Sequence, residues 1–149
     1  MKEFAFRGLI NCASCGSQIT GEEKFKKLAD GSRNRHVYYH CTRQVNYDCP
    51  QPYIRQELLE QELLIIIKSL SIEDVHVSEK LRYCLRQYKD MTKDLVLKQL
   101  KEDTRTQTQV FHSYAAYLIE SGDEKQKAEF YSSLKLDLRL NNRQVVPYK

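Results

Sequence analysis

Four cysteines in the first third of the chain place the strongest constraint on its fold. Cys12 and Cys15 form a C-x-x-C pair followed by Gly16, and Cys41 and Cys49 come after gaps of 25 and seven residues. Two thiolates on one tight turn can bind one side of a tetrahedral Zn²⁺, and a later pair can close the other side. Glycine permits the positive φ that turns main-chain amides towards the sulfurs. We therefore predict a structural zinc site formed by these four cysteines.

Three other interpretations of the cysteines stay open at this point. A disulfide framework belongs to oxidising compartments, whereas cytosolic thiols stay reduced. A thioredoxin-like redox pair needs a βαβ context, which the residues around Cys12 do not suggest. His36 or His40 could replace one cysteine, although a strand over 37–41 would point His40 away from a site that Cys41 faces. The gap before Cys49 is also wider than in most zinc fingers.

Positive charge gathers in the same region. The net charge is +4, and residues 1–55 hold nine Lys and Arg against five acids, whereas the remainder holds 15 of each. A basic small module suits a phosphate backbone. Four zinc-bound thiolates would offset about two of these charges, and a solvated surface would look much the same. The candidate DNA-binding residues are Arg7, Lys24, Lys26, Lys27, Arg33, Arg35 and Arg43.

Short strands are predicted around the cysteines, and helices after them. Residues 22–28 and 35–40 flank Asp30-Gly31, a pair that favours a hairpin turn. After Pro50 and Pro52 we expect a helix from near Tyr53. One apolar stripe marks it, formed by Leu59, Leu63, Ile66 and Leu70. Ser71 is predicted to cap the next helix.

The clearest helical pattern is a heptad seam. Its apolar positions are Val77, Leu81, Cys84, Tyr88, Met91 and Leu95. A returning helix is predicted with Val110, Tyr114, Tyr117 and Leu118 on one face. The two helices are interpreted as an antiparallel coiled-coil arm, and the core of a helical bundle is the alternative. Cys84 fits this seam as a small buried hydrophobic residue.

In the last segment the spacing of apolar residues changes from a helical period to the period of two that is typical of a strand. Gly122 can end the returning helix, and Asp123 can start a short last helix. Residues 134–140 alternate between apolar and polar, Asn141-Asn142 offers a turn, and Arg143 to Tyr148 is interpreted as a return strand. A terminal β-hairpin is therefore predicted, with a single strand as the alternative. The predicted fold is α+β and mainly α: a zinc ribbon over residues 1–52, a helical or coiled-coil region over 53–121, and a short helix with terminal strands over 122–149.

Several of these motifs together resemble the zinc ribbon and the carboxyl-terminal part of large serine recombinases. The resemblance rests on residues 6–16 (FRGLINCASCG), 37–41 (VYYHC) and 51–54 (QPYI), together with Cys49 and the helix that follows, and on 122–125 and 136–140 near the end. It implies that Cys12, Cys15, Cys41 and Cys49 bind zinc. It also implies that the ribbon binds double-stranded DNA, and that a coiled-coil arm between about Ser78 and Tyr117 contacts other recombinase subunits and controls synapsis.

The resemblance does not include the catalytic serine of that family. Only three residues precede Phe4, so we expect no DNA cleavage by this chain alone, whether it is a fragment, a remnant or a separate module. Phosphoryl transfer through serine needs the nucleophile and positive charge aimed at the phosphate. A metalloenzyme is disfavoured because four thiolates leave no open coordination position.

The function predicted from sequence is therefore DNA binding and synapsis control in site-specific recombination and integration. The alternative is a zinc-ribbon adaptor that binds a protein through the heptad seam. No apolar run approaches the roughly 20 residues of a membrane span, and no signal peptide is evident. We expect a soluble, cytoplasmic protein of bacterial or phage type, with no membrane partner and no small-molecule substrate.

Overall fold

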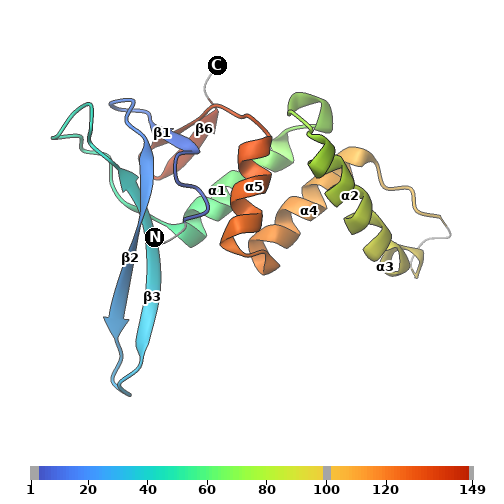
Figure 1. The fold of residues 1–149 in the computed structure, drawn as a ribbon, viewed down its shortest axis with the longest axis horizontal. Coiled ribbons are helices and arrows are strands. Elements are labelled where there is room, and N and C mark those ends of the chain that lie inside the picture. The colour runs from blue at the N-terminus through green and yellow to red at the C-terminus, as the bar shows by residue number, and fades with distance from the viewer. Residues whose placement is uncertain (1–3, 99–101, 148–149) are drawn as a thin grey trace.

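The computed structural model describes residues 4–98 and 102–147 and combines a β-rich module with a group of helices (Figure 1). The strands are β1 (Ile10–Cys12), β2 (Ile19–Lys27), β3 (Arg33–Cys41), β4 (Ile54–Arg55), β5 (Leu138–Asn141) and β6 (Gln144–Pro147). The helices are α1 (Gln56–Ser69), η1 (Ile72–Asp74), α2 (Glu79–Met91), α3 (Lys93–Leu97), α4 (Gln107–Ser121) and α5 (Glu124–Ser133). None of the described helices is long and apolar enough to cross a membrane.

The longest β feature is the antiparallel hairpin of β2 and β3. Its ladder runs from the pair Ile19↔Cys41 to the pair Lys27↔Arg33. At the turn Gly31 has φ +88°, and Asp30 accepts a hydrogen bond of 2.9 Å from the Ser32 amide. The hairpin predicted around Asp30-Gly31 is confirmed. Its outer half projects away from the rest of the molecule (Figure 1).

A second small sheet joins the two ends of the chain. β5 pairs in parallel with β1, from Ile10↔Leu138 to Cys12↔Leu140, and β6 pairs with β5 in antiparallel fashion. The predicted terminal hairpin is confirmed, but its turn lies at Asn142 and Arg143, both with positive φ, as a two-residue hairpin turn requires. Its first strand starts only at Leu138, because α5 continues to Ser133. Tyr148 lies outside the described residues.

Because β1 pairs with β5, the predicted zinc ribbon (1–52) and the predicted terminal segment (122–149) contribute strands to one sheet. The division at residues 52 and 121 stays a prediction.

Aromatic side chains connect the ribbon to the helices. The Phe6 ring centroid lies 5.7 Å from that of Tyr39 in β3 and 5.4 Å from that of Tyr131 in α5. All three rings are fully buried. Such pairs contribute roughly 0.5–1.5 kcal/mol each beyond the burial of their area. The segment before β1 is therefore packed between the hairpin and α5.

A buried polar network reinforces this junction. Lys127 of α5 lies 2.7 Å from the Glu60 carboxylate of α1, and both residues are buried. Gln56 donates to Glu60 and to Glu124, and the other Glu124 oxygen accepts from the Ala5 amide at 3.0 Å. Removal of one partner from a buried pair typically costs about 3–5 kcal/mol, because the other charge remains buried.

The first helix largely follows the predicted stripe. Leu59, Leu63 and Ile66 are buried. The helix begins at Gln56 and not near Tyr53, because Ile54 and Arg55 pair with β3 as a short strand. The cap predicted at Ser71 is present, but it starts the single 3-10 turn η1.

The predicted long seam helix is divided in the structure. α2 ends at Met91, and α3 is a separate short helix. Leu81 is buried and Cys84 is half-buried, whereas Met91 is 73% exposed and Leu95 is 65% exposed. The buried part of the seam packs on α4. A coiled-coil arm is not evident in residues 4–98 and 102–147.

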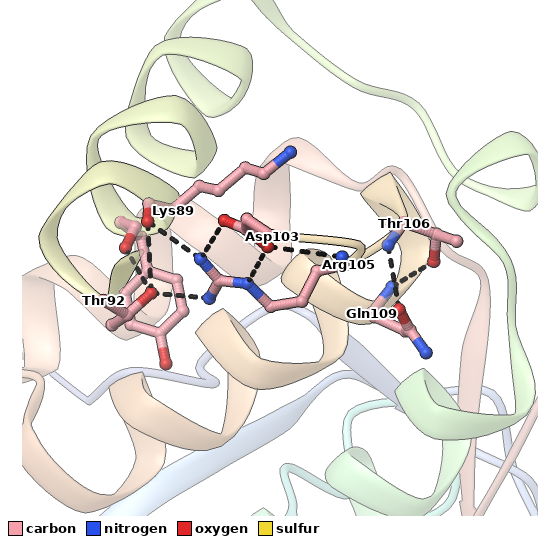
Figure 2. A network of polar contacts seen from close by, with 7 residues as sticks. Lys89, Thr92, Asp103, Arg105, Thr106 and Gln109 are labelled. Carbon is pink, nitrogen blue, oxygen red and sulfur yellow. Dashed lines mark hydrogen bonds and ion pairs between the residues drawn. The ribbon is translucent and has the colours of Figure 1, made fainter. Parts of the chain in front are cut away.

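Arg105 fastens the segment before α4 to the end of α2 (Figure 2). Its guanidinium donates to Thr92 Oγ1 at 2.6 Å and to the Lys89 carbonyl at 2.9 Å. It also forms an ion pair of 2.8 Å with Asp103. This hydrogen bonding lowers the pKa of Asp103 to about 2. Because a last-turn carbonyl of α2 gains a charged donor, Arg105 caps that helix.

Substitution Arg105→Ala is expected to lower the free energy of unfolding by about 1–3 kcal/mol, because hydrogen bonds from a charged donor are lost. Urea denaturation measures the change, with Arg86→Ala on the exposed face of α2 as the control. The Asp103 contribution is present above its ordinary pKa of about 3.9 and is lost as the pH falls towards 2. Equal stability of the two variants at pH 7 would contradict this role.

Candidate metal centre

The four predicted cysteines come from separate turns and strand ends. Cys12 ends β1, Cys15 lies in the turn after it, Cys41 ends β3, and Cys49 lies in the loop before β4. Their sulfurs all lie within 4.8 Å of one another. The Cys12–Cys49 distance is 3.6 Å and the Cys15–Cys41 distance is 3.4 Å. Four sulfurs at about 2.3 Å from Zn²⁺ would lie about 3.8 Å apart in a tetrahedron. The donor set and its spacing therefore fit zinc.

The strand alternation explains why histidine does not join this cluster. Cys41 points to the buried face of β3 together with Val37 and Tyr39. His40 points to the opposite face, where its ring stacks on Tyr53 at 4.5 Å between centroids. His36 lies on that same opposite face. Neither histidine belongs to the group of metal-ligand atoms found in the described residues.

Backbone conformation aims amide groups at the sulfurs. Gly16 has φ +82°, and its amide closes the first turn on the Cys12 carbonyl at 2.9 Å. In this turn the main-chain groups of Ser14 and Cys15 hydrogen-bond to the Cys12 thiol and help to lower its pKa. In the second half of the site Arg43 adopts φ +59°, and its amide donates to Cys41 Sγ at 3.2 Å. Hydrogen bonds to the charged form of a ligand favour that form. The two turns thus stabilise thiolates.

Ser17 and Gln51 are buried polar residues that support the cysteines. Ser17 Oγ is hydrogen-bonded to Cys15 Sγ at 3.2 Å and accepts from the Val45 amide at 2.9 Å. Gln51 Nε2 donates to Cys12 Sγ at 3.4 Å and to Ser14 Oγ at 3.1 Å. Outer partners of this kind orient metal ligands and tune their basicity. Sequence reasoning missed both residues, because a single serine or glutamine gives no periodic signal.

The thiols differ in their ionisation. Hydrogen bonds with Ser17 lower the pKa of Cys15 to about 6. Burial raises the pKa of Cys41 to about 12. Deprotonation of the whole cluster at neutral pH therefore needs a bound cation, and metal binding releases protons. Four thiolates would fill the coordination positions of a tetrahedral Zn²⁺ and would leave none for a reactive water, so a zinc ion held here would have a structural role.

The predicted DNA-binding residues fall into three places. Lys24, Lys26 and Lys27 lie on β2, and Arg33 and Arg35 lie on β3. Arg7 is exposed in the segment before β1, and Arg43 is exposed in the loop between Cys41 and Cys49. The hairpin therefore brings five of the seven together. Arg35 pairs with Glu23 at 2.7 Å, and Lys24 lies 3.9 Å from Glu22. DNA contact by these residues stays a prediction.

Substitution Cys41→Ser is expected to abolish stoichiometric zinc binding and to unfold the ribbon, since metal binding supplies roughly 10–16 kcal/mol in structural zinc sites. Zinc content by mass spectrometry under native conditions measures this directly. Cys84→Ser is the matched control, because Cys84 lies outside the thiol cluster. Equal zinc content in the two variants would contradict the assignment of the site.

Residues 5–65 match the family model described as the recombinase zinc beta ribbon domain. The matched segment contains all four clustered cysteines, β1 to β4 and the first part of α1. Comparisons with curated proteins and with solved structures gave no match. The family match and the thiol geometry together support a recombinase-related zinc ribbon in this part of the chain.

Proposed function

We propose that this chain is the DNA-binding and synapsis-controlling portion of a site-specific serine recombinase, acting in DNA recombination and integration. The observation that carries the proposal is the basic β2–β3 hairpin, which projects from a zinc ribbon of recombinase type. Its partners would be double-stranded DNA and other recombinase subunits. In this role the chain performs no DNA cleavage itself, and it has neither a small-molecule substrate nor a membrane partner.

The shape of the hairpin suits a DNA groove. A two-stranded β-ribbon fits the major groove, which is about 12 Å wide. Near the turn, Lys26, Lys27 and Arg33 are exposed, and none of them forms an ion pair within the described residues. These three residues are called the hairpin tip below. Unpaired cations can replace the counterions that phosphates hold, which favours binding at low salt.

The zinc site supports this role through the base of the hairpin. Cys41 is the last residue of β3 and pairs with Ile19, the first residue of β2. A metal that fixes Cys41 therefore fixes the register and direction of the whole hairpin. Loss of zinc should remove DNA binding even though no basic residue is changed.

The helices offer the surface for control of synapsis. Met91 and Leu95 are large apolar side chains exposed near the end of α2 and on α3. We assign these two residues to contacts with another recombinase subunit, with which they would complete the coiled-coil pairing that the heptad seam predicts. The same observation favours a second candidate function, in which the ribbon is an adaptor that binds an unrelated protein through these helices.

Fluorescence anisotropy with duplex DNA over a salt series tests the proposal. We expect binding that weakens steeply with salt and disappears when a chelator removes zinc. Replacement of the hairpin tip by glutamine (Lys26→Gln, Lys27→Gln, Arg33→Gln) should lower the slope of log K against log salt by about 0.9 per lost phosphate contact. The control variant loses the same three charges from the helices through Lys68→Gln, Arg82→Gln and Arg86→Gln.

No duplex binding at low salt by a zinc-loaded chain would reject DNA binding and leave the adaptor function. Equal DNA binding by the hairpin-tip variant and its control would show that the hairpin tip does not contact DNA.

A further inference from the structure

The outer face of the β2–β3–β4 sheet is lined with rings and cations. The opposite face of this sheet buries Ile19, Val37, Tyr39 and Cys41. Outward-facing positions of such a sheet ordinarily carry polar residues and not large rings. Here they carry His36, Tyr38 and His40 from β3 and Lys24 from β2, and Tyr53 and Arg55 complete the set from the segment around β4. We call these six residues the aromatic–cation row.

Contacts connect the row from end to end. The His40 ring stacks on Tyr53 with centroids 4.5 Å apart. The Lys24 ammonium lies over two rings, 5.1 Å from the Tyr53 centroid and 5.3 Å from the Tyr38 centroid. The Arg55 guanidinium lies 6.0 Å from the Tyr38 centroid.

Arg55 then closes the other end of the row, where its terminal nitrogen lies 2.6 Å from His36 Nδ1. Each of the six side chains therefore touches its neighbour in the row.

The row is built on the surface and not in the core. The Lys24 and Arg55 side chains are each 53% exposed, and both tyrosines are half-buried. Cation–π contacts hold the two cations in place on the sheet at about 0.5–1 kcal/mol each. Cations held in this way lose less side-chain entropy on binding an anion than free lysines do. The row is thus prepared for a polyanion.

An open groove lies beside the row, between β3 and the start of α1. It measures about 570 Å³, and its walls include Asn34, His36, Arg55 and Glu57. Arg55 thus faces both the row and the groove. A ligand lying along the row can extend into the groove and meet the same guanidinium.

Two carboxylates reduce the positive charge of this face. Glu22 lies 3.9 Å from Lys24 and 3.4 Å from His40, and Glu57 lies 4.0 Å from Arg55. These acids would repel a phosphate that approached the row. Their removal should therefore strengthen the binding of an anion at this face, which is a result that a damaged fold cannot produce.

We propose that the aromatic–cation row is a binding face for the sugar–phosphate backbone of duplex DNA, with Lys24 and Arg55 on phosphates and Tyr38 and Tyr53 against deoxyribose. The inference rests on the proposed DNA-binding function and adds Arg55, Tyr38 and Tyr53 to its interface. Because the row lies on the outer face, the duplex lies against that side of the hairpin. Contacts of this kind position a protein on DNA without reading sequence.

Anisotropy titrations of the zinc-loaded chain on duplex DNA test the proposal. We expect Arg55→Gln to weaken binding roughly three- to tenfold and to reduce the salt slope by about 1, as loss of one phosphate contact does. Arg86→Gln, an exposed arginine of α2, is the matched control. Tyr53→Leu should weaken binding, whereas Tyr53→Phe, which keeps the ring, should bind almost as well as the unchanged chain.

A variant that binds DNA more tightly distinguishes the proposed binding face from a general loss of folding, because a misfolded chain would bind less. Glu22→Gln should bind duplex DNA roughly threefold or more tightly, while Glu79→Gln on α2 should bind as the unchanged chain does. If Arg55→Gln, Tyr53→Leu and Glu22→Gln all bind like the unchanged chain while the hairpin-tip variant weakens, the row is not part of the interface and the proposed function stands. No DNA binding by the unchanged zinc-loaded chain overturns both.

Discussion

Four buried or half-buried sulfurs within 4.8 Å of one another are the interaction on which the rest of this structure depends. Thiolates at such distances repel one another unless a cation lies between them, so the cluster needs a metal to ionise at neutral pH. Cys12 and Cys15 lie at the end of β1 and in the turn after it, and Cys41 and Cys49 lie at the end of β3 and in the loop before β4, so one ion ties together β1, the long hairpin and that loop. The surrounding β module is small, and a domain of that size gains much of its stability from such a tie.

The influence of the site extends to the far end of the chain through Gln51. Its amide nitrogen donates to Cys12 Sγ, and its oxygen accepts from the Asn142 amide at 2.5 Å. Cys12 also pairs with Leu140 in the parallel ladder, and the Ala13 amide donates to the Leu140 carbonyl at 2.9 Å. The β2–β3 hairpin, through Cys41, and the terminal strands, through Cys12, therefore share one metal site. In the proposed role, this connection gives the hairpin a fixed direction relative to the helices that contact other subunits.

Local patterns in the sequence predicted the thiol cluster, the hairpin at Asp30-Gly31 and the buried stripe of α1, because each is set by neighbouring residues. The pairing of β1 with β5 could not be predicted, since a three-residue strand gives no periodic signal and its partner is distant in sequence. The seam through Met91 and Leu95 predicts one helix, whereas the structure divides it into α2 and α3. A heptad pattern gives the spacing of apolar residues but not the surface that covers them, and both side chains are largely exposed in the described residues. The aromatic–cation row could not be predicted from local patterns, because Tyr53 and Arg55 come from a part of the chain distant from β2.

Hydrogen exchange measured by mass spectrometry, with zinc bound and after chelation, tests the central claim most directly. If the thiol cluster holds both sheets, chelation will remove amide protection from the β2–β3 hairpin and from β5 together, while α4, which packs on α1 and α2, will keep most of its protection. Retained protection of β5 after zinc is lost, or no change in either sheet, would contradict the claim that one metal site ties the two ends of the chain together.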